Sequence, residues 1–205
     1  GLGDVYKRQG FGNLHTVHQA EEIRDLNFCA IYSNWAFLKT HKAEQFGKRR
    51  LSRVQPVAGK RESYRLLGDI ILTENDVRNK VAYPDAVVTT TWGIDLHYPD
   101  PENSKRFPGM EFIAYAEHKF KQNDVYTFPY RCLYSRNISN LFMAGRNISV
   151  THIALGTVRV QRTTGMMGEV VGVAAYLCKK QKCLPRDVYE HHLDEFMKLV
   201  GKMCD

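Results

Sequence analysis

Four small residues fall on one face of a helix predicted near the end of the chain. This helix is expected to begin at Thr163 or Thr164 and to run to about Lys180. Its small residues recur at helical spacing and are Gly165, Gly168, Gly172 and Ala175. Each interior glycine costs about 1 kcal/mol of helix propensity relative to alanine. We infer a compensating close approach, either of the helix to a sheet or of a ligand to its backbone.

The segment before this helix is long and polar. A short strand, 140–144, is predicted to end at Gly145 and Arg146, with no helix before Thr163. Most strand-to-helix connections are about 2–6 residues long, and ligands bind at the carboxyl ends of strands in open α/β sheets. The predicted helix start lacks acidic residues and follows Arg159 and Arg162. Its free N–H groups and dipole favour an anionic or electron-rich group, such as the N1/C2 carbonyl edge of a reduced flavin.

The positive charge of the chain is local. The net charge is +7, and residues 39–65 hold nine Lys and Arg against Glu44 and Glu62. Such a cluster marks either a nucleic acid or phosphate ligand, or a solvated helix end and loop. Phe46 is the only aromatic residue between Lys42 and Arg61, and nucleic-acid modules usually interleave aromatics with basic residues. Nucleic-acid binding is therefore disfavoured.

Membrane insertion and metal binding are not expected. The longest apolar run, 170–178, is shorter than the roughly 20 residues that span a bilayer. The cysteines form no CxxC pair, and their spacing fits neither a zinc site nor a disulfide framework. Scattered reduced thiols favour the cytoplasm without establishing it. The cysteines are Cys29, Cys132, Cys178, Cys183 and Cys204.

The first residues are interpreted as a sequencing artefact. Residues 1–9 (GLGDVYKRQ) lack an initiator methionine and resemble translated adapter sequence. We expect the natural chain to start near Gly10 and to continue upstream.

The remaining elements follow from hydrophobic periodicity and turn signals. A long amphipathic helix is predicted over 18–40, a short helix capped by Thr73 ends near Lys80, and a final helix starts at Pro185. Residues 98–110 form a loop, and Pro129 indicates an edge position or a bulge. Strands are predicted over 51–58, 62–72, 86–92, 111–117, 125–133 and 140–144.

Several short motifs in sequence order carry a family resemblance. They include Ala144-Gly145-Arg146, Ser149-Val150-Thr151-His152, Val158-Arg159-Val160, Thr163 and the glycines from Gly165 onward. Upstream lie Arg61-Glu62-Ser63 with Arg65, Gly68, Leu72-Thr73, Asp76-Val77, Pro84-Asp85-Ala86, Trp92-x-x-Asp95-x-His97 and Pro129-Tyr130-Arg131. Together these resemble the C-terminal FAD-binding element of bacterial FAD-dependent oxidoreductases related to the heterodisulfide reductase A subunit. The resemblance covers about residues 50–180.

The chain departs from the family pattern at a few positions. Thr91 stands where glycine is expected, Gln161-Arg162 replaces a more apolar pair, and Glu169 replaces glutamine. The nucleotide-binding fingerprint G-x-G-x-x-G does not occur in these residues.

The resemblance implies an α/β fold in which the C-terminal part of an FAD-binding Rossmann-like domain joins a mixed β-sheet substrate lobe with flanking helices. The implied divisions are a substrate or cap lobe at 10–134, the strand-loop-helix of the FAD domain at 135–180 and a C-terminal helix at 181–205. The expected partners are a small-molecule substrate and an N-terminal FAD-binding segment of the same chain. A [4Fe–4S] cluster, which relatives carry, is expected only in that upstream part.

The resemblance also suggests roles for single residues. Asp95 and His97 alternate in an extended segment, so the carboxylate can orient the imidazole as the proton acceptor of a substrate hydroxyl while hydride passes to flavin N5. The alternative is a turn after a strand, with Asp95 as a polar anchor. His152 is a second acid/base candidate, with a structural role as the alternative. The predicted FAD contacts are Gly145, Arg146, Arg159, Thr163, Thr164 and Gly165.

Substrate contacts are predicted for three further residues. Trp92 and Tyr130 are candidates to stack on a ring-shaped substrate, with core packing as the alternative. Arg131 is expected to be paired within the protein or to bind a substrate carboxylate. The sequence thus predicts a fragment of an FAD-dependent oxidoreductase that moves hydride or electrons between a small organic substrate and flavin. The alternative is a non-catalytic module that binds nucleic acid or anionic polysaccharide through residues 39–65.

Overall fold

The computed structural model describes residues 14–15, 17–57, 63–99, 102, 105, 113–118 and 125–202. The chain divides into two compact units, one of residues 1–63 with 97–115 and one of residues 64–96 with 116–205. Helices and strands are mixed, as expected for an α/β chain. The predicted domain boundaries and the Rossmann-like assignment stay predictions.

The first unit contains the long predicted helix. Helix α1 spans Ala20–His41, and α2 spans Ala43–Phe46 after a break at Lys42. Trp35 packs edge-on against Phe46, with ring centroids 6.2 Å apart. Lys39 donates from Nζ to the carbonyls of Phe46, Gly47 and Arg49. This lysine of the basic stretch therefore holds the α1–α2 corner together.

The second unit is built around a two-stranded antiparallel sheet. Strand β1 (Ala86–Thr90) pairs with β4 (Tyr126–Pro129), and the register shifts between Ala86 and Val88. Pro129 is the last residue of β4, in agreement with its predicted edge or bulge position. A 3-10 turn, η2, follows at Tyr130–Cys132. Strands β2 (Asp95–Pro99) and β3 (Ile113–His118) form a separate two-stranded sheet, of which residues 97–99 and 113–115 belong to the first unit.

The predicted short helix and its cap are confirmed. Helix α3 spans Glu74–Arg78, and Thr73 occupies the N-cap. The Thr73 side chain accepts a hydrogen bond from the Asp76 amide, while the Asp76 carboxylate accepts one from the Thr73 amide at 2.7 Å. This reciprocal capping box satisfies two amides that the first helical turn leaves free.

Three of the predicted strands are wrong over their described residues. Segments 51–57, 63–72 and 140–144 have no strand assignment, apart from isolated bridges. Leu72 bridges Val150 in parallel, and Tyr134 bridges Phe142 in antiparallel orientation. Part of the backbone of 66–72 is still paired, because the Leu66 and Leu72 amides donate to the carbonyls of Asn147 and Ser149. These are extended segments with scattered pairing, so strand-like composition did not produce a continuous ladder.

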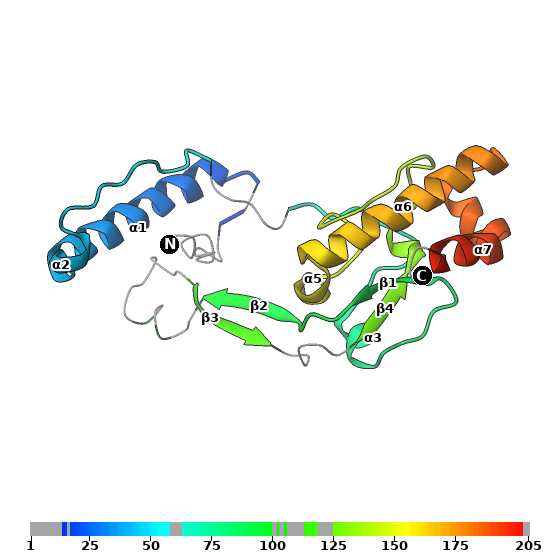
Figure 1. Cartoon of the computed structure of the whole chain (residues 1–205), viewed down its shortest axis with the longest axis horizontal. Coiled ribbons are helices and arrows are strands. Elements are labelled where there is room, and N and C mark those ends of the chain that lie inside the picture. Colours follow the sequence, from blue (N-terminus) through cyan, green and yellow to red (C-terminus); the bar gives the residue numbers. More distant parts are fainter. Residues whose placement is uncertain are drawn as a thin grey trace. The chain divides into compact units, whose positions relative to one another are not determined.

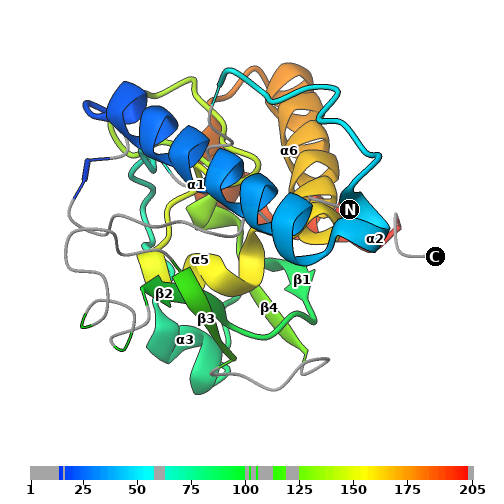
Figure 2. The same cartoon turned by 90° about the vertical axis from the view of Figure 1, so that its left-hand side faces the viewer.

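The long polar connection before the glycine-rich helix contains a helix of its own, so its prediction as a loop is wrong. Helix α5 spans His152–Val158, and α6 spans Gln161–Gln181. The final helix, α7, spans Pro185–Gly201 and kinks at His192. Helix α6 packs on β1 and α7 (Figures 1 and 2). Its buried side is made of Thr163, Met167, Val170, Ala174 and Leu177.

The core of this unit lies between the sheet and the C-terminal helices. Tyr130 is fully buried, and its ring lies 4.7 Å from that of Phe196 and 5.1 Å from that of Tyr134. Its hydroxyl donates to the Pro185 carbonyl at 2.8 Å. Within the described ranges, none of the helices combines the length and hydrophobicity of a membrane-spanning segment.

Candidate functional site

Helix α5 lies directly against the backbone that follows β1. A Cβ atom placed on Gly156 would come within 2.9 Å of the Asp95 carbonyl oxygen and 3.1 Å of the Asp95 nitrogen. Every residue from Ala154 to Val158 is buried. Glycine is therefore required at position 156 by close backbone contact, and this contact fixes α5 on residues 90–95.

Hydroxyl groups lock the same contact. The Thr157 hydroxyl donates to the Trp92 carbonyl, and the Thr90 hydroxyl donates to the Thr157 carbonyl at 3.0 Å. Thr90 and Thr157 are fully buried. Because a buried hydroxyl without a partner costs about 1–3 kcal/mol, these paired threonines define one arrangement of α5 on the segment.

Arg159 and Asp95 meet at the end of α5. Arg159 Nη2 donates to the Asp95 carbonyl at 2.8 Å and lies 3.9 Å from Asp95 Oδ2. The two side chains are only 11% and 16% exposed. The structure thus brings a predicted FAD-contact residue and a predicted catalytic residue together, although they lie 64 positions apart.

Substituting Gly156 with alanine is expected to lower the free energy of unfolding by about 1–3 kcal/mol, because the added methyl group meets fixed backbone. Gly168→Ala is the matched control, since nothing in the described part of the chain lies within 4 Å of a Cβ at Gly168. The control is expected to raise stability by up to about 1 kcal/mol through helix propensity. Urea unfolding measures both. Equal effects of the two variants would contradict the proposed contact with Asp95.

The chain enters the site through a glycine with a positive φ angle. Gly145 has φ +116°, a region that side chains rarely adopt, and its amide donates to Met167 Sδ at 3.2 Å. Residues 149–151 then run beside Leu72, because Leu72 donates to the Ser149 carbonyl and Thr151 donates to the Leu72 carbonyl. The hydrogen bond to Met167 holds the Gly145 turn against α6, and the bonds to Leu72 hold the residues that follow it.

The N-terminus of α6 is electropositive. Val160 occupies the N-cap and supplies no side-chain cap, and the first turn contains no acidic residue. Gln161 and Arg162 are exposed in this turn, whereas Thr163 is 3% exposed. The first amides of a helix and its dipole attract negative charge. This end of α6 therefore favours an anion or an electron-rich group.

The glycine face of α6 is open. A Cβ atom on Gly165, Gly168 or Gly172 would meet nothing within 4 Å among the described residues, and all three glycines are exposed. Helix α6 uses its opposite side to pack on β1 and α7. Among the described residues the glycine face therefore does not lie on a sheet, and the approach of a ligand to this face stays a prediction.

Comparison with protein-family models identifies the chain. The model described as FAD dependent oxidoreductase matches residues 13–200. The chain belongs to this family. No curated protein and no solved structure matched it. FAD is accordingly the cofactor of the family, and the relation to heterodisulfide reductase stays a prediction.

In this FAD dependent oxidoreductase, the predicted FAD contacts converge around α5 and α6. Gly145 contacts Met167 of α6, Arg159 lies between the two helices, and Thr163, Thr164 and Gly165 lie in the first turns of α6. Thr164 donates from its hydroxyl to the Gln161 carbonyl at 3.0 Å. Arg146 is exposed beside Gly145.

The other predicted site residues of this FAD dependent oxidoreductase differ in position and in exposure to solvent. Trp92 is half-buried next to α5, and His152 is exposed at the first position of α5. His97 lies in β2, but its side chain is outside the described residues. Tyr130 is a core residue. The catalytic roles stay predictions.

Arg131 is paired within the protein, the first of its two expected fates. Its Nε and Nη2 donate to the two carboxylate oxygens of Asp85 at 3.0 and 2.8 Å, and its guanidinium lies 4.3 Å from the Tyr189 ring centroid. The hydrogen bond to Asp85 raises the pKa of Arg131. Asp85 is fully buried. The pair anchors η2 to the start of β1 and to α7.

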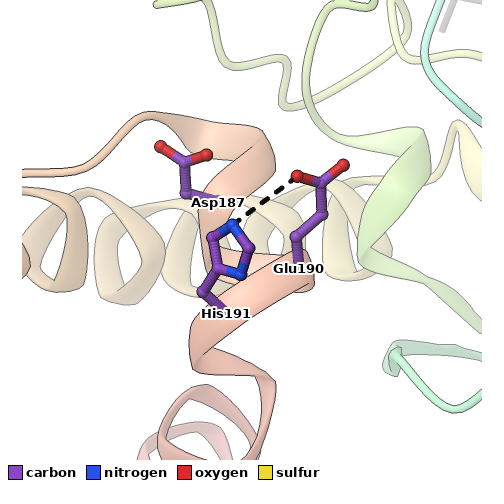
Figure 3. A group of neighbouring side chains, drawn as sticks. All are labelled: Asp187, Glu190 and His191. Atoms are coloured by element: carbon purple, nitrogen blue, oxygen red, sulfur yellow. Dashed lines mark ion pairs between the residues drawn. The ribbon is translucent and has the colours of Figure 1, made fainter.

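One group of metal-ligating residue types occurs on α7, where the sequence predicted no metal site. Asp187, Glu190 and His191 have ligand atoms within 4.8 Å of one another (Figure 3). His191 Nε2 lies 3.9 Å from Glu190, and Asp187 accepts the Leu184 amide at 2.8 Å. Glu190 and His191 are exposed. Their spacing of three and four residues on one helix was the sequence signal for this group.

Proposed function

We propose that the N-terminal end of α6 holds the electron-rich N1/C2 edge of the flavin in an enzyme that oxidises or reduces a small organic substrate. The observation that carries the proposal is the combination, on one helix, of an uncapped, acid-free N-terminus and an open glycine face. The membership of the chain in the FAD dependent oxidoreductase family supports flavin as the occupant.

The residues of this end fit the cofactor chemically. Backbone amides of the first turn donate hydrogen bonds without competition from a side-chain cap, and Arg162 adds positive charge. Arg159 is held by Asp95, so it can contribute its field without moving. FAD, when bound, supplies the electron-accepting ring, while the protein positions it and sets its electrostatic surroundings.

The open glycine face has a separate task in this proposal. Gly165 allows the flavin or its ribityl chain to approach the helix backbone, and Gly168 and Gly172 extend the same face. We propose that the FAD-binding segment expected from the family resemblance covers the rest of this face. The contacts of that segment with α6 would then offset the helix propensity that the three glycines lose.

The substrate side is proposed at α5, where Arg159 holds Asp95. His97, two residues after Asp95 in β2, belongs to the other compact unit, and its role as a proton acceptor rests on the sequence pattern alone. Exposed His152 at the start of α5 is the second candidate to move a proton. In this arrangement a histidine accepts the proton of a substrate hydroxyl as hydride leaves the adjacent carbon. Half-buried Trp92 is the candidate to contact the substrate.

Gln161→Glu tests the flavin end of the proposal. A carboxylate in the first turn of α6 would oppose the negative charge that develops on the flavin edge, so the reduction potential of bound FAD is expected to fall. A shift of about 30 mV corresponds to about 1.4 kcal/mol for a two-electron couple. Gln161→Met, a neutral residue of similar length, is the control and should leave the potential unchanged. Dye-linked titration of the FAD-loaded protein measures both variants. Equal potentials in both variants would contradict the proposed orientation.

A further inference from the structure

The C-terminal end of α6 closes in a way that brings two cysteines together. Lys182 occupies the cap with left-handed angles (φ 53°, ψ 45°), and its amide donates to the Cys178 carbonyl. The next amide, that of Cys183, donates to the same carbonyl at 3.0 Å. This double closure is of the type that reverses the chain after a left-handed residue at a helix end.

The side chains at the two ends of such a closure usually contact each other. Here they are both thiols, because the closing hydrogen bond joins Cys183 to Cys178. The Cys183 thiol is close enough to contribute, after burial, to the raised pKa of Cys178. Both cysteines are half-buried and unoxidised. Ordinary helix-end packing therefore places two reactive groups side by side.

A disulfide requires Cα atoms roughly 4.4–6.8 Å apart and side chains that point toward each other. The 3.0 Å hydrogen bond from the Cys183 amide to the Cys178 carbonyl brings the two backbones close together, which is compatible with this geometry.

We propose that Cys178 and Cys183 form an oxidisable dithiol site, which a peroxide converts into a disulfide that ties the end of α6 to the segment before α7. This site is independent of the proposed flavin end, which lies at the opposite terminus of α6.

The chemistry balances with hydrogen peroxide as the two-electron oxidant. One thiol of the pair attacks a peroxide oxygen, which breaks the O–O bond, releases one water and leaves a sulfenic acid. The second thiol then attacks that sulfur, its proton leaves with the hydroxyl group as a second water, and the S–S bond forms. Burial, followed by the contact with Cys183, raises the pKa of Cys178, which makes the reaction slow at neutral pH because the thiolate is the nucleophile.

The other thiols in the described part of the chain differ in their surroundings. Cys132 is fully buried, and burial raises its pKa strongly, so it should be unreactive. Cys29 is exposed on α1 and lies in the other compact unit. It is suited to single-thiol modification and provides a control for general oxidation.

The test treats the folded chain with hydrogen peroxide and maps the linkage with trypsin without reductant. Lys179, Lys180 and Lys182 lie between the two cysteines, so trypsin separates Cys178 from Cys183 unless a disulfide joins them. The linked peptide pair is expected in the wild type and in Cys29→Ser. In Cys183→Ser, Cys178 should stay a free thiol.

A second arm distinguishes geometry from simple sequence proximity. In a urea-unfolded chain, the yield of the Cys178–Cys183 pair is expected to fall at least several-fold relative to other pairings. Recovery of unlinked Cys178 and Cys183 from oxidised, folded protein would overturn the proposal. Preferential linkage of either residue to Cys29 or Cys204 would also overturn it.

Discussion

Asp85→Ala is expected to lower the free energy of unfolding by about 3–5 kcal/mol, the range for removing one partner of a buried ion pair. Asp85 is fully buried and accepts three hydrogen bonds from Arg131, including one from its backbone amide at 3.0 Å. Its carbonyl also accepts the Tyr130 amide at 2.8 Å. Without the carboxylate, the Arg131 guanidinium, 17% exposed, is left largely desolvated without its counterion. A loss of this size would remove much of the stability of a domain of this kind.

A second carboxylate provides the matched control. Asp69 accepts two hydrogen bonds from Arg186 and one from Tyr134, but the Asp69 and Arg186 side chains are 25% and 41% exposed. Burial opposes its ionisation, yet the hydrogen bonds from Arg186 and Tyr134 outweigh that effect and lower the pKa of Asp69. Asp69→Ala is expected to cost about 1 kcal/mol because solvent screens this pair. Urea unfolding measures both variants: the midpoint is expected to fall while the dependence of the unfolding free energy on urea concentration stays unchanged. Equal losses of unfolding free energy in Asp85→Ala and Asp69→Ala would contradict the claim that burial makes the Asp85–Arg131 pair the more important one.

Local signals in the sequence predicted the helices well. Thr73 with Asp76 three residues later is a capping pattern, and it marks the start of α3. Pro185 begins α7, because proline suits the first turn of a helix. The periodicity of 18–40 gave α1 within two residues at its start and one at its end. These signals depend on neighbours in the sequence, so they do not require the tertiary fold.

Signals that depend on distant partners failed. Residues 63–72 have strand composition, but their partners are single positions in 147–151 and in 131 and 136, so no ladder forms. Helix α5 was missed because its segment is buried nearly all round and lacks amphipathic periodicity. Its position depends on Gly156 meeting the Asp95 backbone. No sequence pattern within 152–158 predicts the contact of Gly156 with the Asp95 backbone.

The candidate site shows the same division. The glycines and arginines around α6 were visible in the sequence, whereas the Arg159–Asp95 and Arg131–Asp85 pairs join residues 64 and 46 positions apart. The five cysteines have no recognisable motif spacing, but the helix-end closure brings Cys178 to Cys183. The stacking role predicted for Tyr130 gains no support, since its ring and hydroxyl are used in the core.

Gly165→Leu is expected to weaken FAD binding by about 100-fold, equivalent to about 2.7 kcal/mol. The leucine side chain would occupy the space in which the proposed flavin meets the first turns of α6. The same side chain should not disturb the fold, because nothing lies within 4 Å of a Cβ at this position among the described residues. Helix propensity should even increase. The variant therefore separates a binding defect from a folding defect.

Gly201→Leu is the matched control, because a Cβ atom at Gly201, the last residue of α7, also meets nothing within 4 Å among the described residues and is not part of the glycine face of α6. The decisive measurement is the FAD dissociation constant of the two variants, determined by flavin fluorescence on protein with equal urea midpoints. We predict that Gly165→Leu loses about 100-fold in affinity and that Gly201→Leu loses less than about tenfold, or about 1.4 kcal/mol. Wild-type affinity in Gly165→Leu would contradict the placement of the flavin at the N-terminal end of α6.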